Sequence, residues 1–199
     1  MNSPGDKPEL LPPDLLLHAY REGVFPMALE NGELGWFSPD PRAIIPLDER
    51  FHIPHGLKRT LKKRPFEIRF DHAFREVMLG CADRPTTWIS RGILDSYVRL
   101  HQMGHAHSVE AWKDGQLAGG LYGVAVGGAF FGESMFSRIT DASKVALVAL
   151  VERLRAKGFL LLDTQWVTGH LKTFGAHEIP RRAYLQRLRR ATALPCRFE

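Results

Sequence analysis

The sequence lacks the features that mark several large classes of protein. It holds only two cysteines in 199 residues, Cys81 and Cys196, far apart and in no CxxC context, so we expect no disulfide framework. No apolar run approaches the roughly 18 residues that a membrane-spanning helix needs. The N-terminal MNSPGDKPELLPPDLLL has no basic stretch followed by an apolar one, as a secretory signal would. We therefore expect a cytoplasmic protein with no membrane association.

What is present is an ordinary globular composition with a basic excess. Hydrophobic residues make up 44% and charged residues 25% of the chain, and the formal net charge is +5, which favours polyanionic partners. The basic residues form two clusters, Lys58, Arg59, Lys62, Lys63 and Arg64, and then Arg181, Arg182, Arg187, Arg189 and Arg190. One such run is typical of a solvated face, but two favour contact with a phosphate backbone, with little readout of bases.

The residue patterns predict a small N-terminal piece followed by a larger α+β body. PPDLLLHAYREG predicts a short helix that Asp14 caps and Gly23 ends. The turn-rich stretch up to Pro41 separates a domain at 1–40 from one at 41–199. In the larger part FEIRF predicts a strand, and two helices are expected with Asp71 and Ser90 as their N-caps.

The second half of the chain predicts three antiparallel strands and a parallel crossover. The D-G at 114–115 and the G-G at 127–128 predict two hairpins. A helix follows, capped by Thr140 or Asp141, and then the apolar run FLLLD at 159–163, a parallel neighbour of FFGESMFSR at 130–138. Two short helices, HLKTF and PRRAYLQRLRRA, are expected last. This order is similar to an acyl-CoA N-acetyltransferase core, so the expected fold is α+β with a small N-terminal domain and an N-acetyltransferase-like (GNAT-like) C-terminal domain.

Two carboxylates and an amide are expected to meet at neighbouring strand ends. Alternation puts Phe131, Glu133 and Met135 on one face, where a carboxylate needs a partner or a task. Asp163 ends FLLLD, and Gln165 points to the same side, at the strand end where open α/β sheets place ligands. A lone acid in a strand is usually a satisfied core group. The convergence makes a catalytic cleft lined by Phe131 and Met135 an equally good interpretation.

Other candidate sites are weaker. MFSRITDASK, which leads into the helix after Thr140, has no glycine to cradle a phosphate, and Asp141 would repel one, which argues against coenzyme A. His105 and His107 form an H-x-H pair, but nothing nearby supplies a third zinc ligand. Cys81 has no patterned base beside it, and Ser134 does not lie in a G-x-S-x-G motif.

Several long segments, taken in chain order, carry a family resemblance. They are HAYREGVFPM, WFSPDPRAII, TWISRGILDSY, LHQMGHAHSVEAW, GGLYGVAVGGAFFGESMFSR, DASK and FGAHEIPRRAYL, which together span about residues 14–190. They resemble the bacterial leucyl/phenylalanyl-tRNA–protein transferases. The resemblance implies transfer of leucine, and also phenylalanine or methionine, from aminoacyl-tRNA to an N-terminal arginine or lysine, which marks the acceptor protein for degradation. An aminoacyl ester is already activated, so no ATP, coenzyme A or metal is expected, and a monomer is the expected state.

The resemblance also assigns roles to residues. Asp163 and Gln165 would form a relay that withdraws the proton of the attacking amine. Glu133 would orient this pair or meet the cationic side chain of the acceptor. Matching positions for the pocket of the donor's apolar side chain are Met135, Leu121, Phe130, Leu150 and Leu154. Trp88 matches an aromatic residue near the terminal adenosine, and Lys58, Arg59, Lys62, Lys63 and Arg64 would contact the tRNA.

Two departures from the family pattern and two alternative functions remain. The N-terminus is short and lacks a glycine-rich segment of longer members, and Met27 stands where some relatives carry tryptophan. Both concern the N-terminal contribution to tRNA binding. A peptidoglycan-bridge ligase also uses aminoacyl-tRNA, but such enzymes usually carry two of these cores. A non-catalytic RNA-binding module would have no need of Glu133, Asp163 and Gln165 together.

Overall fold

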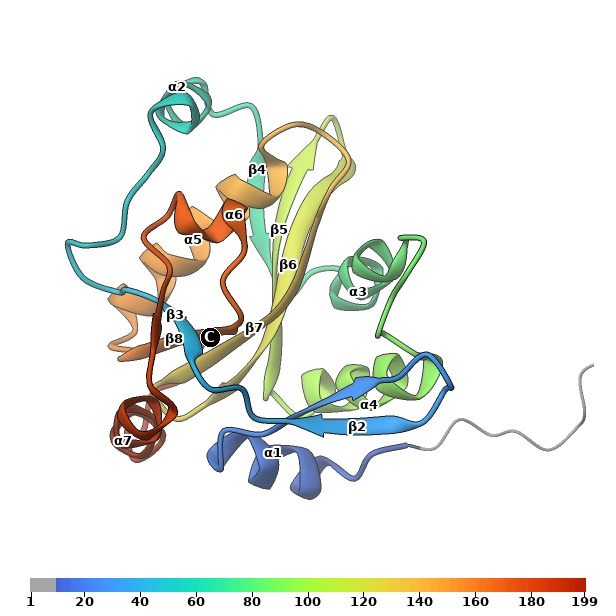
Figure 1. Ribbon diagram of the computed structural model, residues 1–199. Coiled ribbons are helices and arrows are strands. Elements are labelled where there is room, and N and C mark those ends of the chain that lie inside the picture. Colours follow the sequence, from blue (N-terminus) through green and yellow to red (C-terminus); the bar gives the residue numbers. More distant parts are fainter. Residues whose placement is uncertain (1–9) are drawn as a thin grey trace, which may run out of the picture.

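The computed structural model describes residues 10–199, so the start of the expected N-terminal domain lies outside the described residues (Figure 1). A seven-stranded mixed sheet forms the centre, in the order β4-β5-β6-β7-β8-β3-β9, and β1 and β2 form a separate two-stranded sheet. The strands are β1 (Phe25–Ala28), β2 (Leu34–Phe37), β3 (Arg42–Ile45), β4 (Glu67–Phe70), β5 (Ala106–Lys113), β6 (Gln116–Val126), β7 (Ala129–Ser137), β8 (Leu161–Gln165) and β9 (His177–Ile179).

Helices cover both faces of the large sheet. They are α1 (Pro13–Arg21), α2 (His55–Lys63), α3 (Phe74–Ala82), α4 (Arg91–Gln102), α5 (Ala142–Ala156), α6 (Gly169–Lys172) and α7 (Arg181–Thr192). Within residues 10–199, none has the length and apolar character needed to cross a membrane. The mixed α+β character expected from the sequence is confirmed.

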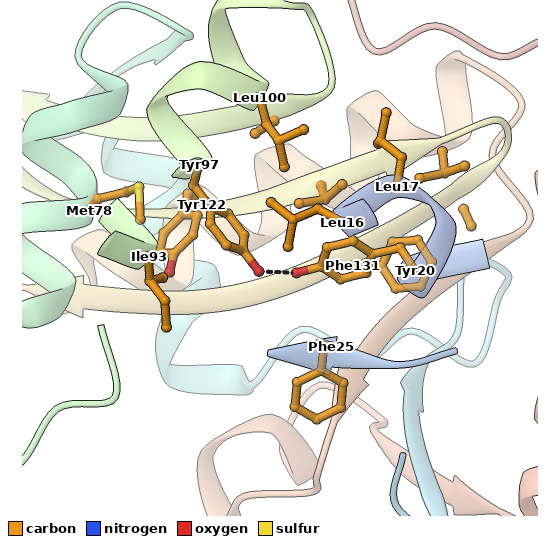
Figure 2. Close-up of a cluster of buried hydrophobic side chains, with 14 of the residues drawn as sticks. Leu16, Leu17, Tyr20, Phe25, Met78, Ile93, Tyr97, Leu100, Tyr122 and Phe131 are labelled. Carbon is orange, nitrogen blue, oxygen red and sulfur yellow. Dashed lines mark hydrogen bonds between the residues drawn. The ribbon is translucent and has the colours of Figure 1, made fainter. Parts of the chain in front are cut away.

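Two apolar cores lie on opposite faces of this sheet. On one face α1, α3, α4 and α7 bury a cluster that includes Leu16, Tyr20 and Tyr97 (Figure 2). On the other face α5 and its neighbours bury a second cluster around Phe130 and Leu150. Helix α1 therefore packs into a core of the main body, since Leu16 and Tyr20 are fully buried.

Most of the predicted strand connections are confirmed. Asp114 and Gly115 both have positive φ and join β5 to β6, and Gly127, at φ +56°, begins the turn into β7. The chain then crosses through α5, and β8 pairs with β7 in parallel. The Ser90 cap is also confirmed, because its hydroxyl accepts a hydrogen bond from the backbone N–H of Ile93.

Two other predicted helix caps, Asp14 and Asp71, are wrong, and Asp141 is correct in position only. Asp14 lies within the first turn of α1. Asp71 precedes α3 and instead accepts a hydrogen bond from the backbone N–H of Ser108. Asp141 does occupy the N-cap position of α5, but its carboxylate accepts hydrogen bonds from Lys144 and Thr60 rather than from the helix backbone.

Five elements were not expected from the sequence: the strands β1, β2, β3 and β9, and the helix α2. The basic segment at 58–64 is largely helical, in α2, and RAII at 42–45 forms β3. Strand β3 lies between β8 and β9 and is antiparallel to both, with Ile44 opposite Asp163. It therefore carries Arg42 to the edge of β8, beside the acid and the amide that the sequence predicts at the site.

Candidate active site

A cavity of about 300 Å³ lies where β7 and β8 part. The two strands pair only from Ala129 to Phe131 and from Leu161 to Asp163. Beyond that point β7 runs on to Ser137 without β8 beside it. The cavity lining draws on both cores: Phe25, Met27, Trp88 and Tyr122 lie toward α1, and Leu121, Met135, Leu147, Leu150 and Leu162 lie toward α5.

A β-bulge sets the position of Glu133. Tyr122 pairs with Ser134 and the next residue of β6, Gly123, pairs with Gly132, so Glu133 has no partner on β6. An extra residue of this kind reverses the alternation of the strand. The expectation that Phe131, Glu133 and Met135 share one face is therefore wrong.

Phe131 and Met135, two residues before and after Glu133, lie in different cores. Phe131 packs in the α1 core, where its ring lies 4.8 Å from that of Tyr20, and it does not line the cavity. Met135 packs in the α5 core opposite Leu121. The bulge thus puts the carboxyl group and the apolar Met135 side chain on the same cavity from two directions.

Glu133 is half-buried and borders the cavity. Its Oε1 accepts hydrogen bonds from the Tyr20 hydroxyl at 2.8 Å and from Nε2 of Gln165 at 3.3 Å. Tyr20 is in turn hydrogen-bonded to the hydroxyl of Tyr97 on α4 (Figure 2). Burial raises the pKa of Glu133 to about 8, against the lowering effect of the Tyr20 hydrogen bond. The carboxyl group is therefore poised to exchange a proton near neutral pH.

Asp163 is held in a buried ion pair. Arg42 donates from Nη2 to Oδ2 at 2.6 Å and from Nε to Oδ1 at 2.9 Å, and both side chains are almost completely buried. The Tyr184 hydroxyl donates to Oδ2, and the backbone N–H of Gln165 donates to Oδ1 at 2.9 Å. Both carboxylate oxygens are thus occupied, and Asp163 does not line the cavity.

Gln165 connects the two acids. Its φ of +58° is unusual for a side-chain-bearing residue, and the hydrogen bond from its N–H to Asp163 holds this conformation. Its side-chain amide then reaches Glu133. The result is a continuous chain of contacts from Arg42 through Asp163 and Gln165 to Glu133.

The structure brings most of the predicted residues together. Those that line the cavity are Glu133, Gln165, Met135, Leu121, Leu150 and Trp88. Phe130 and Leu154 are buried in the α5 core and lie outside the lining. Lining residues that were not predicted from the sequence include Phe25, Arg84, Tyr122, Leu147, Leu162, Thr164, Trp166, Thr168, His170 and Leu171. Of these, only Leu147 could have been predicted, because it lies one helical turn before Leu150 and so on the same face of α5.

The first basic cluster lies on the surface. Its five side chains, Lys58, Arg59, Lys62, Lys63 and Arg64, are exposed, and within residues 10–199 none of them forms an ion pair. Helix α2 is joined to the start of α5 by the Thr60–Asp141 hydrogen bond of 2.9 Å. The arginines of the second cluster are also exposed, along α7.

The sequence also offered His107, Cys81 and Ser134 as weaker candidates, and the structure shows what each side chain contacts. His107 bonds through Nδ1 to Asp71 and stacks on Phe198. Over the described part of the chain, no group of three or more metal-ligating side chains is found. Burial raises the pKa of Cys81 to about 12, so its thiol stays protonated. Ser134 accepts a hydrogen bond from Nη2 of Arg84.

Comparisons with known proteins agree on one family. A family model described as leucyl/phenylalanyl-tRNA protein transferase matches residues 44–189, and one for the N-terminal domain of the same family matches 9–40. Relatives named leucyl/phenylalanyl-tRNA–protein transferase include one from Herpetosiphon aurantiacus, 60% identical over 94% of this chain and 96% of its own length. Another, from Akkermansia muciniphila, is 60% identical over 91% and 96%, and one from Gloeobacter violaceus is 56% identical over 94% and 97%.

Proposed function

The chain belongs to the leucyl/phenylalanyl-tRNA–protein transferase family and is an aminoacyl-tRNA transferase, and we propose that it uses the cavity between β7 and β8 to join the donor amino acid to the α-amine of an N-terminal arginine or lysine. The product would carry a new N-terminal leucine or phenylalanine, or methionine, that marks the protein for degradation in the cytoplasm. The observation that carries the proposal is an apolar cavity that ends at a carboxyl group and an amide.

The donor side chain would occupy the apolar side of the cavity. This part is lined by Leu121, Met135, Leu147, Leu150 and Leu162. In such a pocket one methylene changes binding by about 1 to 3 kcal/mol, so leucine, methionine and phenylalanine should differ in degree. A side chain seated there places the ester carbonyl toward Gln165 and Glu133.

The reaction needs a proton acceptor and no further activation. The acceptor nitrogen attacks the ester carbonyl, the C–N bond forms, and the bond to the ribose oxygen breaks, with that oxygen leaving as a hydroxyl. Glu133 would take the amine proton and pass it to the leaving ribose oxygen, since its pKa of about 8 is close to that of an α-amine. The ester is already activated, so we propose no ATP, coenzyme A or metal.

Asp163 would act through Gln165. Both of its oxygens accept hydrogen bonds inside the protein, so we assign it a positioning role rather than direct proton transfer. Its bond to the backbone of Gln165 would hold the Gln165 amide against Glu133 and leave the amide oxygen to accept from the incoming amine. This assignment revises the relay that the resemblance implies.

The proposal also includes the domain division, the acetyltransferase-like fold and the monomeric state expected from the sequence. The antiparallel meander, the crossover through α5 and the parting of β7 and β8 support an acetyltransferase-like (GNAT-like) domain at 41–199, with residues 1–40 as a smaller domain. We propose a monomer as the working unit.

The basic cluster on α2 would bind the donor tRNA. Changing Lys62, Lys63 and Arg64 to glutamine should weaken tRNA binding, and the slope of log affinity against log salt should fall by about 0.9 for each duplex phosphate that the protein no longer neutralises. Filter binding over a salt series measures both. Changing Lys113 and Lys157, which are equally exposed and lie outside both basic clusters, is the matched control. An unchanged slope for the α2 variant would remove this helix from the tRNA site.

Met135 would form part of the leucine pocket. Met135→Ala should lower kcat/KM for leucyl-tRNA at least about 10-fold, because several methylene-sized groups leave the apolar lining. The fold should survive, since the side chain is only partly buried. Met103→Ala, at an exposed position outside this cavity, is the control. Equal leucine transfer by a well-folded Met135→Ala protein would exclude Met135 from the pocket.

A transfer assay tests the proposed function. The protein is mixed with leucyl-tRNA and a peptide that begins with arginine, and then with one that begins with alanine. We expect leucine on the arginine peptide only. Bound tRNA without transfer to either peptide would favour the RNA-binding module, and leucine on a peptidoglycan precursor instead would favour the ligase.

A further inference from the structure

Three buried polar side-chain atoms in residues 10–199 have no hydrogen-bond partner: the Tyr122 hydroxyl, Oγ1 of Thr164 and Nε2 of His170. All three residues line the cavity between β7 and β8. Buried polar atoms in proteins are nearly always paired, because an unpaired one loses its bonds to water without compensation. Unpaired atoms gathered at one cavity therefore indicate where a polar ligand group completes the site.

Thr164 lies at the boundary between the apolar and the reactive parts of the cavity. On β8 it follows Leu162 by two residues, so both side chains point to the α5 face. Its chain neighbour Gln165 holds the amide that reaches Glu133. The Thr164 hydroxyl thus falls between the place of the donor side chain and the place of the ester carbonyl.

His170 comes from a different wall of the cavity. It lies on α6, and its ring packs edge-on against Phe174 at a centroid distance of 5.4 Å. Burial lowers its pKa, and nearby Lys144 lowers it further against the opposing effect of Asp141. The imidazole is therefore neutral near pH 7, so a ring nitrogen is free to accept a hydrogen bond. Tyr122 packs instead in the α1 core, beside Phe74 and Tyr97.

The chemistry of the donor identifies the missing group. In an aminoacyl ester the α-carbon joins the side chain, the carbonyl and a free α-amine. With the side chain among the leucines and the carbonyl toward Gln165, the amine must lie at the boundary between them. A buried amine or ammonium is costly without hydrogen-bond acceptors. Thr164 and His170 are the side chains there that each hold a polar atom without a hydrogen-bond partner.

We propose that Thr164 and His170 form a subsite for the free α-amino group of the aminoacyl donor, and that this subsite excludes N-acylated aminoacyl-tRNA. The proposal rests on the proposed function of the cavity. An N-acetyl group turns the amine into an amide with one N–H and adds a carbonyl that needs a donor of its own. A site built for a hydrogen-bonding group rejects an analogue without it far more strongly than an apolar pocket rejects a missing methylene.

Three donors test the subsite: leucyl-tRNA, N-acetyl-leucyl-tRNA and the tRNA ester of 4-methylpentanoic acid, which keeps the leucine side chain but has no group in place of the amine. We expect the wild-type protein to prefer leucyl-tRNA over both others by at least about 100-fold in kcat/KM. Thr164→Val keeps the shape but loses the hydroxyl, and should lower leucyl transfer about 10- to 100-fold while transfer from the amine-free donor changes little. Thr164→Ser should retain the preference, and His170→Phe, which keeps the packing on Phe174, should reduce it. Thr86→Val, at an exposed position, is the control.

Two results would overturn the subsite. One is a wild-type protein with equal kcat/KM for N-acetyl-leucyl-tRNA and leucyl-tRNA. The other is a Thr164→Val protein in which transfer from all three donors falls by the same factor. Failure of the proposed function looks different, because then no leucine is transferred by the wild type. In that case binding of amide-linked leucyl-adenosine and its N-acetyl form decides. A preference for the free amine that Thr164→Val removes supports the subsite, and equal binding of the two forms contradicts it.

Discussion

Replacing Glu133 by glutamine should reduce leucine transfer by about 100- to 10,000-fold, the usual contribution of a general base. Glutamine keeps the size of the side chain and still accepts the hydrogen bond from Tyr20. What it loses is the ability to take a proton from the acceptor amine. Single-turnover transfer from leucyl-tRNA to an arginine peptide measures the loss, and tRNA binding should be unchanged.

The same substitution should stabilise the protein in alkaline solution. Burial raises the pKa of Glu133 from 4.5 to about 8, so between these values the folded state holds a proton that the unfolded state has lost. The free energy of unfolding therefore falls as pH rises across this window, by up to about 1.4 kcal/mol for each unit of pKa shift. Glu133→Gln removes this loss, so the variant should match the wild type near pH 4.5 and exceed it at pH 8.5.

Urea unfolding at the two pH values measures the effect, and Glu152→Gln, at an exposed position on α5, is the control. Because every other titrating group is shared, the difference between the two proteins isolates Glu133. Full transfer activity in the Glu133→Gln protein would remove the carboxyl group from the chemistry. Lower stability at pH 8.5 would mean that Glu133 is a structural acid stabilised by its partners.

Removal of Asp163 should cost both stability and activity. Asp163→Ala leaves the buried guanidinium of Arg42 without its partner, and breaking a buried ion pair in this way typically costs about 3 to 5 kcal/mol. Transfer should also fall, because Gln165 loses the acceptor that fixes its backbone. Urea unfolding and the transfer assay measure the two effects separately.

A double variant separates the structural role of Asp163 from its positioning role. Arg42→Met with Asp163→Leu removes both charges and should recover part of the stability but none of the transfer. Asp48→Ala is the control, since its pair with Arg50 is exposed and such pairs contribute at most about 1 kcal/mol. An Asp163→Ala protein as stable as the wild type, or a double variant with full activity, would contradict this account.

Local signals in the sequence predicted the parts of the fold that local physics decides. Asp114 and Gly115 specify a hairpin because both adopt positive φ, and the Ser90 side chain caps a helix within three residues of itself. The parallel pairing of β7 and β8 followed from the length of the crossover alone. The convergence of Glu133 and Gln165 on one site followed from that pairing.

Features that depend on distant contacts were not predictable in this way. Arg42 meets Asp163 across 121 residues, and nothing in RAII indicates that the arginine is buried. The bulge at Glu133 has no local signature either, yet it decides which side chains share the cavity with the acid. A strict alternation therefore placed Phe131 in the site and gave no reason to include Thr164.

The most direct test is a crystal structure with amide-linked leucyl-adenosine bound. The account predicts the leucyl side chain against Met135 and Leu150, with the carbonyl beside Gln165 and within reach of Glu133. A leucyl group seated elsewhere, such as the polar hollow beside Asp141 and Lys144, with Glu133 and Gln165 untouched, would contradict it.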